Sequence, residues 1–205
     1  MTAPLNRRQL EQIRCGRLGV TTGSLAAVHR SWGIINRAQG AWLLNHGVSP
    51  EAIIEPHPVG AAWVRFLGDA TFEAVKGTEP QALRALTFRI VDGDEVVDLA
   101  AWSPRTGQIG NWRGVGFALG QDAIFNPATF FDGGALRLHA TPLEWLQANR
   151  DGICIVRPKL TYAMLHQVPR ICAADPQLAE QIPQWLQPPE PEAKIISPKN
   201  IGAMT

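Results

Sequence analysis

Side chains able to act in catalysis are few in this sequence, and they lie far apart. Cys154 could act as a nucleophile only with a base beside it, and the candidate bases are His139 and His166. An apolar residue flanks the cysteine on each side, which is typical of a small buried hydrophobic residue. Cys154, His166 and Cys172 also lack the tight spacing of zinc ligands. The sequence thus identifies no catalytic residue and predicts neither a bound metal nor a cofactor.

An acidic group consists of Asp92, Asp94, Glu95 and Asp98 and could hold a divalent cation. The glycine and the terminal glutamate of a calcium-binding loop do not follow at the required offsets. A hairpin turn that carries solvated acids explains the group better, because Gly93 lies within it.

Three glycines, Gly114, Gly116 and Gly120, have one residue too many between them for a dinucleotide-binding fingerprint. The preceding residues 110–113 do not form a buried strand pattern, so the strand–turn–helix context of that fingerprint is missing. We therefore expect a glycine-rich turn that packs closely against its neighbours.

Basic residues are concentrated in the first quarter of the chain. Residues 1–50 carry a net charge of +5 and the remaining residues −4, although the whole chain carries only +1. Such asymmetry favours contact with nucleic acid or with another acidic partner. The alternative is a solvated helical surface that faces an acidic body.

Within this basic part, residues 14–30 resemble a helix-turn-helix unit. Cys15, Gly19, Val20, Leu25 and Val28 supply the small and apolar residues and the turn glycine at the required offsets. The resemblance implies a second helix that enters a groove of DNA. The side chains that would then face a groove or phosphates are Arg14, Arg17, Thr21, Thr22, Ser24, His29 and Arg30. A plain helix–turn–helix without DNA binding is the alternative, since an arginine occupies position 14, where an apolar residue is usual.

Helices are predicted before and after a sheet-rich middle. A short helix at 5–16 precedes a longer helical pattern from Ser24 to Gly47, inside which Gly33 and Gly40 can introduce kinks. Ser49 and Pro50 then begin a short helix that must end before Pro56.

Towards the C-terminus, Thr141, Pro142 and Glu144 form a capping box with proline in the first helical position. Helical patterns return at 160–167 and after Asp175, and Pro183 should kink or end the last helix.

In the middle of the chain, polar and apolar residues alternate as they do in β-strands. Residues 62–67 and 71–75 flank one turn, and residues 86–91 and 95–102 flank the Asp-Gly turn at 92–94. Two hairpins of this kind predict an antiparallel sheet with one covered face. Further strands are expected at 135–139 and at 153–156, the second of them wholly apolar and therefore central.

These elements predict an α+β fold with a helical N-terminal region, an antiparallel-rich sheet built from hairpins, and C-terminal helices. A chain of 205 residues corresponds to about one domain, which we place at 1–187. Its expected parts are a helical basic region at 1–55, a sheet-rich core at 60–157 and C-terminal helices at 158–187, followed by a proline-rich extended tail at 188–205.

The sequence also predicts the compartment. We find no apolar stretch long enough to span a membrane and no secretory signal, and three cysteines fit no disulfide framework. A cytoplasmic protein without a membrane partner is expected.

Three segments, 97–104, 114–120 and 142–146, resemble uncharacterised proteins of proteobacterial phages and mobile elements, over about residues 60–186. The resemblance implies an origin in a phage or mobile element and implies no activity.

Two hypotheses of function follow. The first is a non-enzymatic accessory protein of phage or mobile-element type that binds DNA or a host protein through its basic N-terminal helices, with a homo-oligomer left open. The second is a small enzyme with a site near the 103–120 loops and the sheet. The lack of a clustered catalytic motif favours the first.

Overall fold

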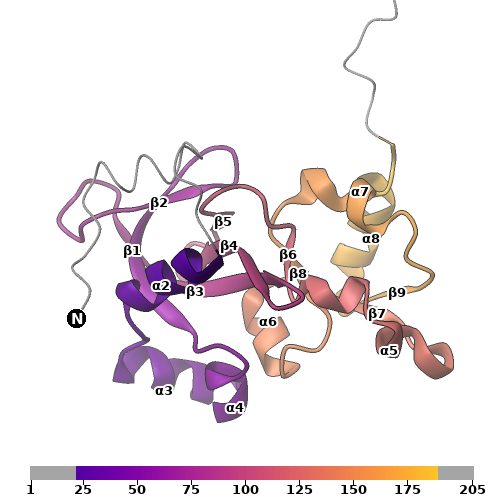
Figure 1. Cartoon of the computed structure of the whole chain (residues 1–205), viewed down its shortest axis with the longest axis horizontal. Coiled ribbons are helices and arrows are strands. Elements are labelled where there is room, and N and C mark those ends of the chain that lie inside the picture. The colour runs from indigo at the N-terminus through magenta and orange to yellow at the C-terminus, as the bar shows by residue number, and fades with distance from the viewer. Residues whose placement is uncertain (1–21, 189–205) are drawn as a thin grey trace, which may run out of the picture.

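Two β-sheets organise the chain in the computed structural model, which describes residues 22–188 (Figure 1). The first sheet is antiparallel, with strands in the order β2-β1-β3-β4-β5. Its strands are β1 (Gly60–Phe66), β2 (Phe72–Ala74), β3 (Leu83–Asp92), β4 (Glu95–Trp102) and β5 (Ile109–Asn111). Both predicted hairpins are therefore confirmed, and so is the α+β class.

The second sheet has the order β6-β8-β7-β9. Its strands are β6 (Ala118–Leu119), β7 (Leu136–His139), β8 (Ile153–Ile155) and β9 (Ile171–Ala173). β7 pairs in parallel with both β8 and β9, while β6 and β8 are antiparallel. The predicted strands at 135–139 and 153–156 thus form a separate mixed sheet, in which β8 is internal as expected.

Short helices surround the two sheets. The α-helices are α2 (Thr22–Trp32), α3 (Arg37–Asn45), α4 (Pro50–Ile54), α5 (Pro127–Phe130), α6 (Pro142–Gln147), α7 (Thr161–Leu165) and α8 (Pro176–Trp185). Single 3₁₀ turns lie at Gln121–Ile124, Phe131–Gly133 and Pro158–Leu160. Among the described residues, no helix has the length and apolar character that a membrane crossing requires.

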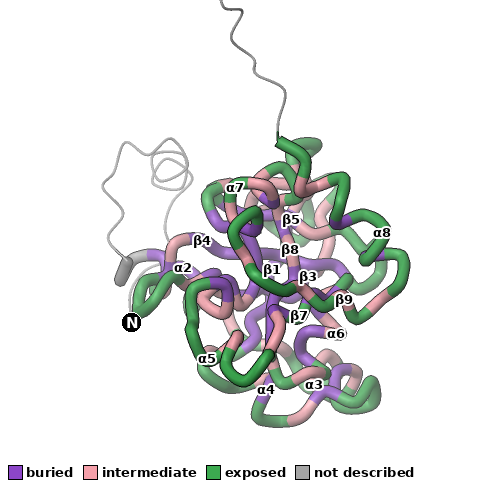
Figure 2. The backbone as a smooth tube through the Cα atoms, turned by 90° about the vertical axis from the view of Figure 1, so that its right-hand side faces the viewer, coloured by how far each residue is buried: buried purple, intermediate pink, exposed green. Residues whose placement is uncertain are grey.

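The alternation of side chains along β3 divides the core into two layers. Leu86, Phe88 and Ile90 point to one face, where they pack with residues of α3, α4, α6 and β8. On the opposite face of the first sheet, Leu25 and Val28 of α2 pack against Val64, Leu99 and Ala101. A third cluster fills the space around the second sheet, and Figure 2 shows the buried residues along the central strands.

The helical pattern predicted from Ser24 to Gly47 is wrong in one respect, because it forms two helices. Gly33 has a φ of +91°, a left-handed conformation that ends α2. Asn36 then caps α3 by accepting a hydrogen bond from the amide of Gln39, whose side chain accepts in turn from the amide of Asn36. Gly40 lies inside α3, and Gly47 follows its end as expected.

Pro183 also behaves differently from the prediction. It lies inside α8, which continues to Trp185 instead of ending or breaking at the proline. Leu178 and Ile182 on the buried side of this helix pack into the cluster around the second sheet, together with Trp185. This packing holds the last turn in place although the proline has no amide hydrogen to donate. The predicted helix at 5–16 and the tail from 189 onward lie outside the described residues.

Asp98 does not belong with the solvated acids of the hairpin turn, which is a third correction. Asp92, Asp94 and Glu95 are exposed as expected, but Asp98 is fully buried on β4. Its carboxylate accepts four backbone hydrogen bonds, from the amides of Leu99, Arg113, Val115 and Gly116, at 2.8–3.0 Å. The 113–116 loop therefore takes its shape around this carboxylate.

Gly116 completes the same arrangement. A Cβ atom at this position would lie 2.6 Å from Cδ1 of Ile90 and 3.0 Å from Cβ of Asp98. Only glycine lets the loop approach the sheet this closely, so the expectation of a tightly packed glycine turn is confirmed.

Thr141→Ala should lower the free energy of unfolding by about 1 kcal/mol, because Thr141 Oγ1 accepts the amide hydrogen of Glu144 at the start of α6. Urea denaturation measures this change. Thr78→Ala, in an exposed loop, is the matched control and should leave the midpoint unchanged. Equal midpoints for the two variants would show that the cap does not stabilise α6.

Asp98→Asn should cost roughly 3 kcal/mol of stability, because an amide group would replace one acceptor oxygen opposite backbone amides that have no other acceptor. Asp94→Asn, in the exposed turn, is the control and should cost almost nothing. Denaturant titration of both variants tests this, and a loss below about 1 kcal/mol for Asp98→Asn would contradict the assigned role.

Candidate anion-binding site

Arg89 lies on the face of β3 that α2 covers, and two histidines hold its side chain. Its Nε donates to Nδ1 of His29 at 3.4 Å, and its Nη1 donates to Nδ1 of His57 at 3.2 Å. A guanidinium group can only donate hydrogen bonds, so both Nδ1 atoms must carry a lone pair. Both imidazoles are therefore neutral, and each carries its proton on Nε2.

His29 is the buried member of this group, with only 2% of its surface exposed. Its protonated Nε2 lies 3.2 Å from the carbonyl oxygen and 3.2 Å from the hydroxyl of Thr87, which both face it from β3. Burial lowers the pKa of His29 to about 4, and the charge of Arg89 acts in the same direction. The ring thus docks α2 onto the sheet as a neutral hydrogen-bonding group.

Arg150 lies on the other side of His57. Its Nε donates to the carbonyl oxygen of Ala52 at 2.8 Å and its Nη2 to that of His57 at 2.9 Å. The guanidinium carbon lies 5.3 Å from the centre of the Trp145 ring, a cation–π distance. Burial lowers the pKa of Arg150 to about 10, so this arginine stays charged at neutral pH.

These residues form one positively charged group, which we call the Arg89 cluster: Arg30, Arg89, Arg150, His29 and His57. Partial burial lowers the pKa of Arg89, and so does the charge of Arg30, which is exposed on the last turn of α2. Partial burial, Arg89 and Arg150 together lower the pKa of His57. The five groups therefore interact electrostatically with one another.

Within residues 22–188, no carboxylate forms an ion pair with the cluster. The arginine ion pairs in this part of the chain are Arg65 with Glu73 and Arg137 with Asp151, and both lie outside the cluster. Arg89 and Arg150 are held by imidazole nitrogens, carbonyl oxygens and an aromatic ring, all of them neutral. Both side chains are therefore held in place, and neither forms an ion pair with a described carboxylate.

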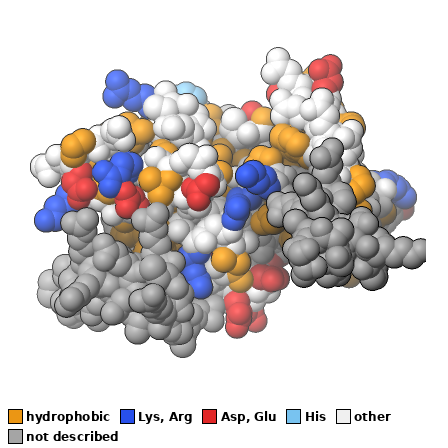
Figure 3. All heavy atoms as spheres, turned by 90° about the horizontal axis from the view of Figure 1, so that it is seen from above, with side chains coloured by type: hydrophobic (Ala, Val, Ile, Leu, Met, Phe, Trp, Pro, Cys, Tyr) orange, Lys and Arg blue, Asp and Glu red, His pale blue; other side chains and the backbone are white. Residues whose placement is uncertain are grey.

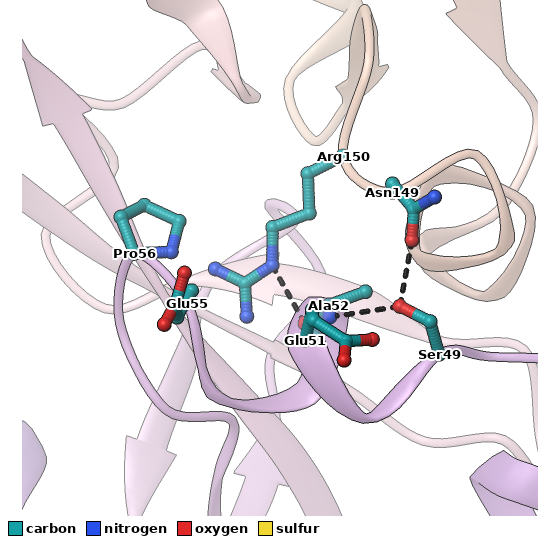
Figure 4. Close-up of a pocket in the computed structure, with 7 residues that line it drawn as sticks. All are labelled: Ser49, Glu51, Ala52, Glu55, Pro56, Asn149 and Arg150. Atoms are coloured by element: carbon teal, nitrogen blue, oxygen red, sulfur yellow. Dashed lines mark hydrogen bonds between the residues drawn. The ribbon is translucent and has the colours of Figure 1, made fainter.

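A pocket of about 420 Å³ lies beside Arg150 (Figure 4). Its lining residues are Ser49, Glu51, Ala52, Glu55, Pro56, Asn149 and Arg150. The hydroxyl of Ser49 joins its two sides, since it donates to Oδ1 of Asn149 at 2.7 Å. Two exposed glutamates line this pocket, so it disfavours an anion. The side of His57 that faces Arg89 is the better anion site.

The structure places the residues predicted to bind DNA as follows. Arg14, Arg17 and Thr21 lie outside the described residues, and Thr22 and Ser24 lie in the first turn of α2. Arg30 is exposed, as the prediction requires. His29 was expected to face a groove, and this is wrong, because its ring points into the protein and is bound to Thr87.

Sequence reasoning missed Arg89, His57 and Arg150. The alternation of Thr87, Phe88, Arg89 and Ile90 predicts the strand and places Arg89 on its polar face. This pattern does not indicate which side chains contact Arg89, since His29 precedes Arg89 by 60 residues. The sequence distance from His57 to Arg150 is greater still, at 93 residues.

Two polar side chains near the 103–120 loops, where the alternative hypothesis places an enzyme site, are enclosed in the fold. Asp98 accepts four backbone hydrogen bonds, and Ser103 is buried. His139 does stand in register with Cys154, but its Nε2 is 2.8 Å from the carbonyl oxygen of Asp151, and burial raises the pKa of the Cys154 thiol. Among the described residues, no group of three His, Cys, Asp or Glu side chains could hold a metal ion.

No family model, no curated protein and no solved structure matches this chain. The resemblances to a helix-turn-helix unit and to proteins of phages and mobile elements therefore stay predictions.

His29 predicts a specific dependence of stability on pH. Its pKa is about 4 in the folded protein and 6.5 for an ordinary histidine, so the unfolded chain takes up a proton first as the pH falls. The contribution of neutral His29 to the free energy of unfolding should be present in full above pH 7. It should fall by about 2 kcal/mol between pH 7 and pH 5, and continue to fall until the folded-state pKa is reached. Urea denaturation at several pH values measures it.

His29→Gln should lose most of this pH dependence, whereas the control His166→Gln, in an exposed position, should keep it. An unchanged pH dependence in His29→Gln would show that His29 is not the group responsible.

Proposed function

We propose that this chain is a non-enzymatic accessory protein that binds DNA through the Arg89 cluster and the adjoining face of α2. The observation that carries the proposal is the way in which Arg89 is held. Two neutral imidazoles fix the guanidinium group and leave its charge available. The excess of basic residues in the first fifty positions supports the same partner.

Holding an arginine in this way favours anion binding for two reasons. The side chain has already lost its rotamer freedom, so ligand binding causes little further loss of conformational entropy. The partial burial of Arg89 and His57 also lowers the local dielectric, which strengthens the attraction to a negative charge. Arg30 stands exposed beside them and can contact a neighbouring phosphate.

The rest of the surface is not uniformly basic. Figure 3 shows a face on which basic and acidic side chains are interspersed. A nucleic acid is attracted most strongly where several positive charges occur together without acidic neighbours. Glu51 and Glu55 lie beside Arg150, so within the described residues the Arg30 and Arg89 end of the cluster meets that condition best.

The test is DNA binding measured by fluorescence anisotropy with a labelled duplex of mixed sequence. Affinity should fall at least tenfold between about 50 mM and 200 mM salt, because phosphate contacts release counterions. The double variant Arg30→Gln/Arg89→Gln should bind more weakly and lower the salt slope by about 2, one unit for each lost phosphate contact.

Arg105→Gln is the matched control, since Arg105 is exposed on the 103–107 turn, outside the cluster. It should bind like the unchanged protein. Absence of binding at micromolar protein and low salt would refute the proposal and favour a protein partner or a second copy of the chain. An equal loss in the control would show that the cluster is not the binding site.

A further inference from the structure

We propose that the Arg89 cluster binds a terminal phosphate, the phosphate monoester at the end of a nucleic-acid strand. This inference rests on the proposed function and makes it more specific. It concerns the ligand group that Arg89 and Arg30 would bind, while the remainder of the nucleic-acid strand would lie along α2.

The donors of Arg89 and Arg30 point to a compact anion. Arg89 donates through Nε and Nη1 to the two histidines, and its Nη2 has no partner among the described residues. His57 accepts at Nδ1 and its ring also forms a hydrogen bond with the backbone of Pro56, so it serves to hold Arg89 in place. Arg30 is exposed and close enough to Arg89 for its charge to act on that group. One small group of acceptor oxygens can therefore bind between the two guanidinium groups.

The charges point to a monoester. Arg30 and Arg89 are close enough for each charge to affect the other, and Arg150 adds a third positive charge behind His57. A phosphate monoester carries a charge of about −1.5 to −2 at neutral pH and presents three acceptor oxygens. A phosphodiester within a strand carries a single negative charge. The dianion therefore matches the cluster better.

The position of Arg89 in the fold favours the end of a nucleic-acid strand as its ligand. β1 begins at Gly60, which pairs with Thr87, so Arg89 lies two residues beyond the last pair between β1 and β3. The segment 55–59 runs past this point and contributes His57. Arg89 and His57 are half-buried, in contrast to the exposed Arg30. A projecting terminal phosphate can reach the half-buried pair, whereas a continuous backbone would meet Arg30 first.

The experiment compares two single strands of the same sequence, one with a 5′-phosphate and one with a 5′-hydroxyl, by fluorescence anisotropy. A label at the 3′ end leaves the tested end free. The phosphorylated strand should bind about tenfold more tightly, as expected for charge-assisted hydrogen bonds gained at one group. Arg89→Gln should abolish this preference, while the control Arg105→Gln should keep it.

Arg30→Gln provides a variant that leaves the histidine contacts intact, since Arg30 is exposed and takes no part in them. Its preference for the phosphorylated strand should be reduced but still present. Thermal melting of each variant checks that it is folded, so that a loss of preference can be assigned to the site.

Each outcome decides between the two proposals. Equal affinity for both strands, or a preference that survives in Arg89→Gln, overturns the terminal-phosphate site and leaves DNA binding standing. If neither strand binds, calorimetry with a nucleoside 5′-monophosphate decides. If the unchanged protein binds the nucleotide and Arg89→Gln does not, the phosphate site is supported and DNA binding is refuted. If the unchanged protein does not bind the nucleotide either, both proposals are refuted.

Discussion

The buried carboxylate of Asp98 connects the two halves of this fold. Asp98 belongs to β4 of the first sheet, and three of its four backbone partners lie in the 113–116 loop that leads into β6 of the second. A buried charge is tolerated only when hydrogen bonds replace its lost hydration. Those bonds fix the path of the chain between the sheets, and Gly116 allows the loop to come close enough to make them. The second sheet is placed by this connection.

Asp98 and Arg89 illustrate two uses of a charge without a counter-ion. The carboxylate is enclosed, and both of its oxygens accept backbone hydrogen bonds, so it has a structural role. Arg89 is also held by neutral groups, but it is only half-buried, and its Nη2 has no partner among the described residues. A group that is fixed, charged and accessible is suited to bind a ligand. The complete burial of Asp98 therefore makes it part of the scaffold, whereas the partial exposure of Arg89 makes it a candidate binding group.

Local rules accounted for most of the elements. The Asp-Gly turn at 92–94 predicted the central hairpin because glycine accepts a positive φ, and Gly93 has a φ of +58°. Thr141 and Pro142 predicted the start of α6, and Ser49 and Pro50 that of α4, because caps act over only three or four residues. The two failures had different causes. Gly33 adopts a left-handed conformation that ends α2, whereas packing around the second sheet lets α8 continue past Pro183.

By itself, the sequence determined the α+β class, the two hairpins, the helix starts and the concentration of positive charge near the N-terminus, since each depends on neighbouring residues or on composition. Only the tertiary structure decided that His29 points inward, that Asp98 is buried and that Arg89 and Arg150 both bind His57. These contacts join segments far apart in the chain. Their geometry depends on how α2 and the 55–59 segment pack on the sheet, and no local pattern encodes that packing.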